Sequence, residues 1–127
     1  MHKSRLAQLT IDCQTDELDR AADFWAHALG ASVKKLTDPS EANYRSLSMP
    51  ADQVQIEVQK VDHPSRVHLD IEADDVEAEV RRLEKLGAKR VTQVRSWWVM
   101  EAPTGQRFCV VRVQRSDFAA RANTWTE

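Results

Sequence analysis

Polar and apolar residues alternate along several short stretches of the chain, and this period of two predicts β-strands. In residues 6–14, Leu9, Ile11 and Cys13 fall on one face of such a strand, and the polar residues between them fall on the other. The pattern predicts a half-buried strand. Six more strands are expected at residues 31–36, 44–49, 53–61, 66–72, 91–94 and 97–101, and a seventh at residues 107–113.

Apolar residues recur at helical spacing in two longer stretches, from Leu18 to Leu29 and from Val76 to Leu86. Each stretch follows residues that can cap a helix and ends at a glycine, as expected for a helix of ordinary length. The capping residues are Thr15 or Asp16 for the first helix and Asp74 or Asp75 for the second, and the glycines are Gly30 and Gly87.

The order strand, helix and three strands occurs twice, which predicts a duplicated βαβββ unit. Module one covers about residues 5–61 and module two about 66–114, and residues 115–127 are expected to form a short appendage or helix that docks on a neighbour. Aligning the two helix ends, with one residue of slack in the strand–helix loop, equates Thr10 with His68 and Asp12 with Asp70. We therefore expect one α+β domain over residues 1–127, in which paired modules form an eight-stranded cupped mixed sheet with one helix per module.

The composition limits the kinds of molecule that the protein is expected to bind. The 127 residues carry a formal net charge of −2 with both signs interspersed, so no basic surface for nucleic acid is expected. No segment has the length of a membrane span or the pattern of a signal peptide, which predicts a cytoplasmic protein without membrane contact. Cys13 and Cys109 lie inside apolar strands, where unbridged thiols usually pack as small hydrophobic side chains.

Several polar residues are expected to face the open side of the sheet. Glu57 lies in a polar row on its strand, and His68 and Asp70 alternate with apolar neighbours on theirs. A histidine there can serve as a general acid or base, or it can be purely structural. For Asp12 and Asp70, pairing with arginines such as Arg45 or Arg107 is the simpler interpretation. Trp98, or alternatively Trp97, can form an aromatic wall for a flat ligand, although packing in the core or an interface is the simpler interpretation.

Three segments together resemble the vicinal oxygen chelate superfamily, and most closely its small glyoxalase-like branch, which shares a fold with bleomycin-resistance proteins. The segments are ADFWAHALGA, VHLDIEADDVEAEVRRLEKLGA and MEAPTGQRFCVV. The resemblance spans about residues 6–113. It implies paired βαβββ modules, frequent homodimers, and either a divalent metal or a metal-free ligand in the cup.

In metal-dependent members of that superfamily, the ligands come from the first and last strands of each module. The resemblance places those positions at Thr10, Glu57, His68 and Cys109. Only Glu57 and His68 match the usual ligand types, because Thr10 replaces a His or Gln and Cys109 replaces a Glu. Two protein ligands leave most of the coordination to water, which predicts weak metal binding. A set of Glu57, His68 and Cys109 would be chemically suited to zinc, and no base for Cys109 can be identified from the sequence.

From these observations we expect a protein that binds a small molecule in the cup, with no cofactor and no complete metal site. The expected ligand-binding residues are Thr10, Asp12, Glu57, His68, Asp70, Trp98 and Cys109. One alternative is a metal-dependent lyase, isomerase or dioxygenase that uses Glu57 and His68 as metal ligands. Another is a non-catalytic protein whose cup serves as a dimer interface. A homodimer is expected in each case, and the sequence leaves open whether the protein is an enzyme.

Overall fold

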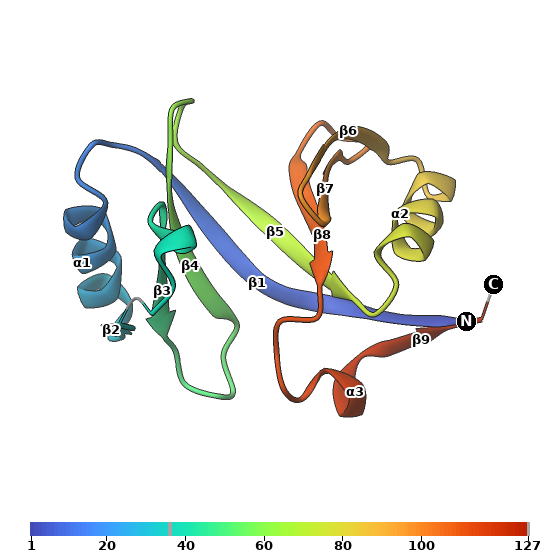
Figure 1. The fold of residues 1–127 in the computed structure, drawn as a ribbon, viewed down its shortest axis with the longest axis horizontal. Coiled ribbons are helices and arrows are strands. Elements are labelled where there is room, and N and C mark those ends of the chain that lie inside the picture. The colour runs from blue at the N-terminus through green and yellow to red at the C-terminus, as the bar shows by residue number, and fades with distance from the viewer. Residues whose placement is uncertain (36, 127) are drawn as a thin grey trace. The chain divides into compact units, whose positions relative to one another are not determined.

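The computed structural model describes residues 1–35 and 37–126. It contains the two expected βαβββ modules in chain order (Figure 1). Module one consists of β1 (His2–Gln14), α1 (Leu18–Leu29), β2 (Ser32–Val33), β3 (Tyr44–Ser48) and β4 (Gln55–Val61), with a short 3-10 helix at Pro39–Glu41. Module two consists of β5 (Arg66–Ala73), α2 (Val76–Lys85), β6 (Lys89–Val94), β7 (Trp97–Glu101) and β8 (Arg107–Arg112). The tail adds α3 (Phe118–Arg121) and β9 (Asn123–Trp125).

These elements confirm the α+β class and the helix in each module. The described residues form nine strands rather than eight, because the tail supplies β9. Of the strand expected at residues 31–36, only β2 forms, and Leu36 lies outside the described residues. The chain divides into two compact units, which are described separately below. The N-terminal unit is Gln8–Val67, and the C-terminal unit is Met1–Ala7 with His68–Glu127.

In the N-terminal unit the strand order is β2-β3-β4-β1, and β1 runs parallel to β4. Parallel pairing within one module requires a crossover, which α1 and the β2–β3 hairpin provide. The core of this unit joins α1 to β3 and β4, and it includes the apolar side of β1 as predicted. Its buried members are Leu18, Ala26, Leu47, Ile56 and Val58, with Leu9, Ile11 and Cys13 packed against them.

The first helix begins without the expected side-chain cap. Its N-cap residue is Glu17, whose side chain makes no capping hydrogen bond, and Thr15 Oγ1 instead accepts a hydrogen bond from the Glu17 backbone N–H at 2.9 Å. The predicted cap at Thr15 or Asp16 was therefore wrong. The predicted end is confirmed, because Gly30 adopts φ +68°, a left-handed conformation that glycine adopts without steric cost.

In the C-terminal unit the strand order is β5-β8-β7-β6, and β5 runs parallel to β8. The apolar face of α2 packs on these strands through a core of Ala73, Val80, Met100, Phe108 and Val110. Asp75 caps α2 by accepting a hydrogen bond from the Ala78 N–H at 3.0 Å, so one of the two predicted caps is confirmed.

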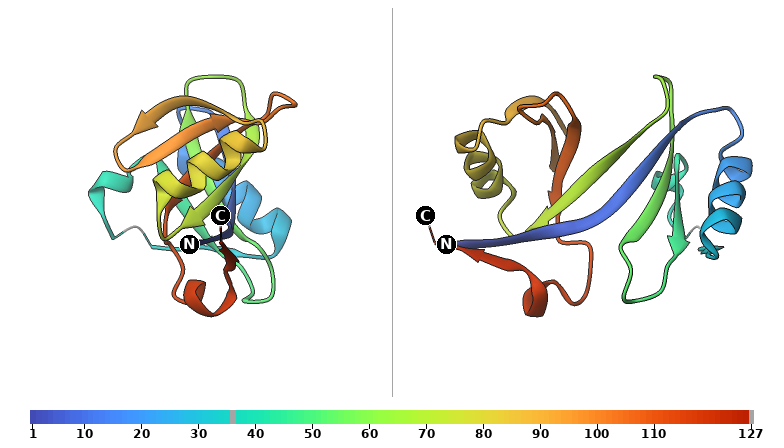
Figure 2. Two further views of the ribbon diagram at one scale, coloured as in Figure 1. Left: turned by 90° about the vertical axis from the view of Figure 1, so that its right-hand side faces the viewer. Right: turned by 180° about the vertical axis from the view of Figure 1, so that it is seen from behind.

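The tail packs on the C-terminal unit of its own chain, whereas a neighbour was expected. Strand β9 pairs antiparallel with the first residues of β1, which sets Trp125 opposite His2 and places β9 beside the start of β1 (Figure 2). Trp125 donates a hydrogen bond from Nε1 to Ser4 Oγ at 2.8 Å, and the Arg82 guanidinium lies 3.7 Å from the centroid of its ring. Phe118 of α3 is 5% exposed. The tail is therefore an integral part of this unit.

Buried ion pairs connect α2 and β5 to the first residues of β1. Glu79 is fully buried, and its carboxylate accepts hydrogen bonds from Arg82 at 2.8 and 2.9 Å and lies 2.8 Å from His2 Nε2. Glu72, also fully buried, accepts a hydrogen bond from Arg5 Nε at 2.7 Å and others from the backbone at the start of the tail. Such groups are tolerated in a protein interior because each charge is paired and hydrogen-bonded.

None of the helices within residues 1–35 and 37–126 has the length and apolar character that crossing a membrane requires.

Candidate functional site

Strand β5 presents a row of polar side chains on one face, and this face is the more buried of the two. The His68 side chain is 10% exposed, Asp70 is 6% exposed and Glu72 is fully buried, whereas the apolar Leu69 is 45% exposed. The alternation was predicted correctly. The burial of the polar face was not predicted, because an alternating strand usually turns its polar side toward water.

The central pair of this row consists of His68 and Asp70. His68 Nδ1 lies 3.1 Å from Asp70 Oδ1, and the side chains are 10% and 9% exposed. Residues two apart on a strand project from the same face, so the strand itself positions them together. A carboxylate this close to one ring nitrogen restricts the orientation of the imidazole.

Cys109 lies beside this pair on the neighbouring strand. The parallel register of β5 and β8 sets Asp70 opposite Cys109. One ligand atom from each of His68, Asp70 and Cys109 lies within 4.8 Å of the other two. Three of the expected ligand-binding residues thus form one cluster, which we call the His68 cluster.

These three residues could hold a metal ion, since nitrogen, carboxylate oxygen and sulfur are all ligands that zinc accepts. Metal–ligand bonds of about 2.0–2.3 Å place tetrahedral ligands roughly 3.3–3.8 Å apart. Atoms up to 4.8 Å apart would have to close by about an ångström to share one ion. The donor set fits zinc, and the cluster includes Asp70, which was not among the expected metal ligands.

The expected residues of module one lie in the N-terminal unit. Glu57 on β4 is set opposite Thr10 on β1, and its Oε1 accepts a hydrogen bond from Gln8 Nε2 at 3.2 Å. Thr10 is fully buried, and Glu57 is half-buried. Gln8 was not singled out from the sequence, although its amide is a residue type that the superfamily uses at the first ligand position.

The observed strand registers correct the expected alignment of the modules. If Glu57 and Cys109 are equivalent, as expected, then Thr10 corresponds to Asp70 and Gln8 corresponds to His68. The segment from Gln8 to Gly30 is three residues longer than that from His68 to Gly87, and two of these residues lie in the longer helix. The alignment that equated Thr10 with His68 allowed a length difference of only one residue between the two segments, which was too small.

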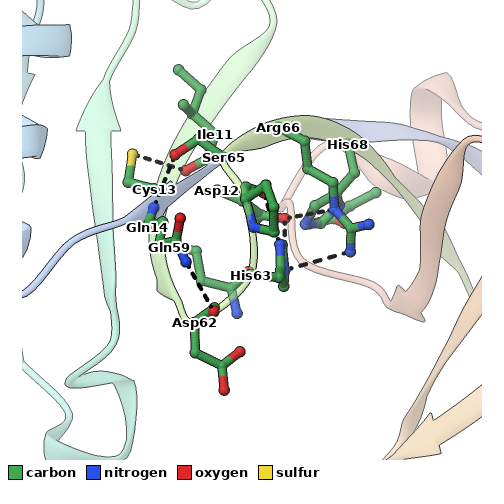
Figure 3. A network of polar contacts seen from close by, with 12 residues as sticks. Ile11, Asp12, Cys13, Gln14, Gln59, Asp62, His63, Ser65, Arg66 and His68 are labelled. Atoms are coloured by element: carbon green, nitrogen blue, oxygen red, sulfur yellow. Dashed lines mark hydrogen bonds and ion pairs between the residues drawn. The ribbon is translucent and has the colours of Figure 1, made fainter.

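Asp12 on β1 is the centre of a second polar network, which includes residues of the connection between β4 and β5 (Figure 3). Its Oδ2 lies 3.5 Å from Arg66 Nε and 3.9 Å from His63 Nε2, and the Asp12 side chain is 2% exposed. Gln14 extends this network through hydrogen bonds to Ser65 and Asp62 at 3.0 and 3.1 Å. Pairing of Asp12 with an arginine was the simpler of the two interpretations, although Arg45 and Arg107 were the expected partners.

A hollow of about 740 Å³ opens next to this network and is lined mainly by polar residues. It shares Gln14, Asp62 and His63 with the network but none of the seven expected ligand-binding residues. The lining residues are Gln14, Thr15, Asp16, Asn43, Gln59, Lys60, Val61, Asp62 and His63.

Trp98 packs on the helix side of β7, against the core that α2 covers. The guanidinium of Arg90 lies 5.0 Å from the centroid of its ring. The register sets Val99 opposite Cys109, so Trp97, by alternation, shares the face of the His68 cluster. Of the two tryptophans considered, Trp98 thus makes the contacts of a core residue.

The duplicated βαβββ architecture and the polar strand faces define an α+β protein of the glyoxalase type. The family model described as "Glyoxalase-like domain" matches residues 8–111, and the chain therefore belongs to that family. No curated protein matches the sequence.

Solved structures share the fold at low sequence identity. Methylmalonyl-CoA epimerase from Mycobacterium tuberculosis is 18% identical with a TM-score of 0.62, and the match covers 91% of each chain. A Streptomyces coelicolor methylmalonyl-CoA epimerase variant in complex with 2-nitronate-propionyl-CoA is 13% identical with a TM-score of 0.52, covering 86% of this chain and 98% of that one. A hypothetical protein from Bacillus halodurans C-125 is 13% identical with a TM-score of 0.55, covering 89% and 98%. These similarities confirm the vicinal oxygen chelate fold.

Proposed function

We propose that this protein binds a small organic molecule at the His68 cluster and that His68 exchanges a proton with it without a bound metal. The observation that carries the proposal is the His68–Asp70 pair, held at 3.1 Å with both side chains about nine-tenths buried. An imidazole oriented by a carboxylate is suited to general acid–base work near neutral pH.

Acyl-CoA thioesters are the first ligands to test. Similar folds have been solved with methylmalonyl-CoA and with 2-nitronate-propionyl-CoA, although their low identity to this chain supports only the choice of probe. Proton transfer at the carbon next to a thioester carbonyl is a reaction that a histidine base can perform.

The test measures binding of propionyl-CoA and methylmalonyl-CoA by calorimetry and thermal shift, and exchange of the α-proton by NMR in D2O. We expect binding to the wild type, and loss of proton exchange in His68→Gln with the fold retained. His27→Gln is the matched control, because His27 is an exposed histidine on α1. Proton exchange that persists in His68→Gln would refute the role of His68. If neither CoA ester binds, acyl-CoA ligands are excluded.

Metal-dependent chemistry is the second candidate, and the nitrogen, oxygen and sulfur donors of the His68 cluster favour it. A zinc ion held there would act as a Lewis acid on a ligand oxygen. Metal analysis of protein purified without tag or chelator tests this candidate. If the wild type holds one metal ion per chain and His68→Ala holds none, the metal-dependent candidate is favoured over the metal-free proposal. The metal content of His68→Ala is compared with that of the wild type after dialysis of the wild type against zinc.

We also propose a homodimer in the cytoplasm. Leu6 and Leu69 of the C-terminal unit are each 45% exposed, and burying such side chains is a common driving force for self-association. Cys13 and Cys109 form no disulfide, which is consistent with a reducing compartment. Light scattering coupled to gel filtration measures the mass, and Leu69→Asp should shift a dimer toward the 14.5 kDa monomer.

A further inference from the structure

We propose that Cys109 is a nucleophilic thiol whose proton is taken by His68, and that it forms covalent adducts with α,β-unsaturated carbonyl compounds. This proposal rests on the proposed function, because it assigns an electrophilic class of ligand to the same cluster. The sequence offered no base for Cys109, and the structure supplies one from a strand about 40 residues earlier in the chain.

The geometry combines three roles in one cluster. Cys109 provides the sulfur, His68 an imidazole within 4.8 Å of it, and Asp70 a carboxylate 3.1 Å from that imidazole. A nucleophile beside a base that a third group orients is the arrangement that activates thiols in cysteine-dependent enzymes. Cys109 is half-buried, so part of the residue remains exposed to solvent.

The other cysteine provides an internal comparison, because its surroundings suppress reactivity. Cys13 packs against the apolar core of the N-terminal unit, and its Sγ lies 3.6 Å from the carbonyl oxygen of Ile11. Burial raises the pKa of the Cys13 thiol, and the nearby charge of Asp12 raises it further. A thiol in such surroundings is a poor nucleophile.

The proposed step is an addition that needs no oxidant or reductant. The Cys109 thiol passes its proton to His68, and the thiolate sulfur forms a bond to the β-carbon of the ligand. The electrons of the carbon–carbon double bond move toward the carbonyl to give an enolate. The imidazolium of His68 then returns the proton to the α-carbon. The net change is addition of S–H across the double bond, and the imidazole is regenerated.

N-ethylmaleimide is the probe, because it has this electrophilic group and needs no specific pocket. The full chain in EDTA is reacted at one fixed pH, and the rate at each cysteine is measured by peptide mass spectrometry. We expect Cys109 to react at least about tenfold faster than Cys13, and His68→Ala to remove this advantage, since a positioned base contributes at least that much. Cys13 should react at its wild-type rate in His68→Ala, which shows that the fold is intact.

His27→Ala is the control for histidine removal, and Asp70→Asn should give an intermediate rate at Cys109 because the imidazole remains but is less well oriented. Equal rates at the two cysteines, or an unchanged Cys109 rate in His68→Ala, would overturn the proposal. So would one tightly bound zinc per chain that resists EDTA and blocks alkylation. Binding of propionyl-CoA to Cys109→Ser is measured in parallel, so that loss of ligand binding and lack of thiol reactivity are told apart.

Discussion

Replacing Glu79 with glutamine should destabilise the protein strongly, although the two side chains have nearly the same shape. The Glu79 carboxylate is fully buried and receives two hydrogen bonds from Arg82, while His2 Nε2 lies 2.8 Å from it. Glutamine offers one neutral carbonyl oxygen and turns an amide N–H₂ toward these donors. The mutation therefore removes the ion pair and leaves Arg82 without its counter-charge.

The size of the effect follows from the burial of each partner. Breaking a fully buried ion pair by removing one member costs about 3–5 kcal/mol. Arg82 is 20% exposed and lies over the Trp125 ring, so it can recover some solvation and keep that contact. We therefore expect a loss of about 2–3 kcal/mol in the free energy of unfolding. At roughly 4 °C per kcal/mol for a chain of this length, the melting temperature should fall by about 8–12 °C.

Urea unfolding followed by tryptophan fluorescence and circular dichroism measures this loss. Glu84→Gln is the matched control, because Glu84 lies on the same helix and its ion pair with Arg90 is partly exposed at 39% and 27%. Its removal should cost about 0.5 kcal/mol or less, as is usual for surface ion pairs. If Glu79→Gln lost no more stability than Glu84→Gln, the buried cluster would not be an important source of stability.

Three further predictions concern α2 and the glycines that follow α1 and α2. Burial tends to raise the pKa of Glu79, but the hydrogen bonds from Arg82 and His2 outweigh burial and hold that pKa below its ordinary value. The ionised Glu79 should therefore stabilise the fold fully above the unfolded-state pKa of about 4.3, and this contribution should be lost as the pH falls through the lower folded-state pKa. Urea titrations of the wild type and of Glu79→Gln should accordingly converge in acid. Asp75→Ala removes the N-cap of α2 and should cost about 1 kcal/mol by the same assay. Gly87→Ala should lower the free energy of unfolding more than Gly30→Ala does, although both glycines have positive φ. The reason is that a Cβ at Gly87 would lie 3.1 Å from Pro103 Cγ, whereas a Cβ at Gly30 would meet nothing within 4 Å. Equal losses of stability would show that backbone conformation alone sets the cost.

Local patterns predicted the two modules because each element is encoded within a short stretch of sequence. The helical spacing before Gly30 and Gly87 and the alternation in β1 and β5 gave element types that the structure confirms, although β1 begins at His2, four residues before its expected start. The tail was harder, because its docking depends on contacts with residues far away in the sequence, at separations that reach 121 positions. Trp125, for instance, is held by Ser4 and Arg82, and no local pattern relates these three residues.

The candidate site was predicted in its residue types but not in its arrangement. His68 and Asp70 are neighbours on one strand, so their common face follows from alternation alone. Which residue of β8 meets them depends on the strand register, which helix and loop lengths set and which periodicity cannot reveal. Because the register was unknown, the sequence alignment of the two modules treated Thr10 as the equivalent of His68 and overlooked Gln8.

The parallel register also explains why Cys109 changed in significance between sequence and structure. In the sequence it is an apolar strand residue that replaces an expected glutamate, with no base nearby. In the structure it lies opposite Asp70, within reach of His68, on a strand face whose polar residues are unusually well buried. A thiol in place of a carboxylate weakens the case for a hard-metal oxygen site and strengthens the case for either zinc or covalent chemistry. The reactivity of Cys109 relative to Cys13 in the presence and absence of zinc therefore decides between the two proposed chemistries of the His68 cluster.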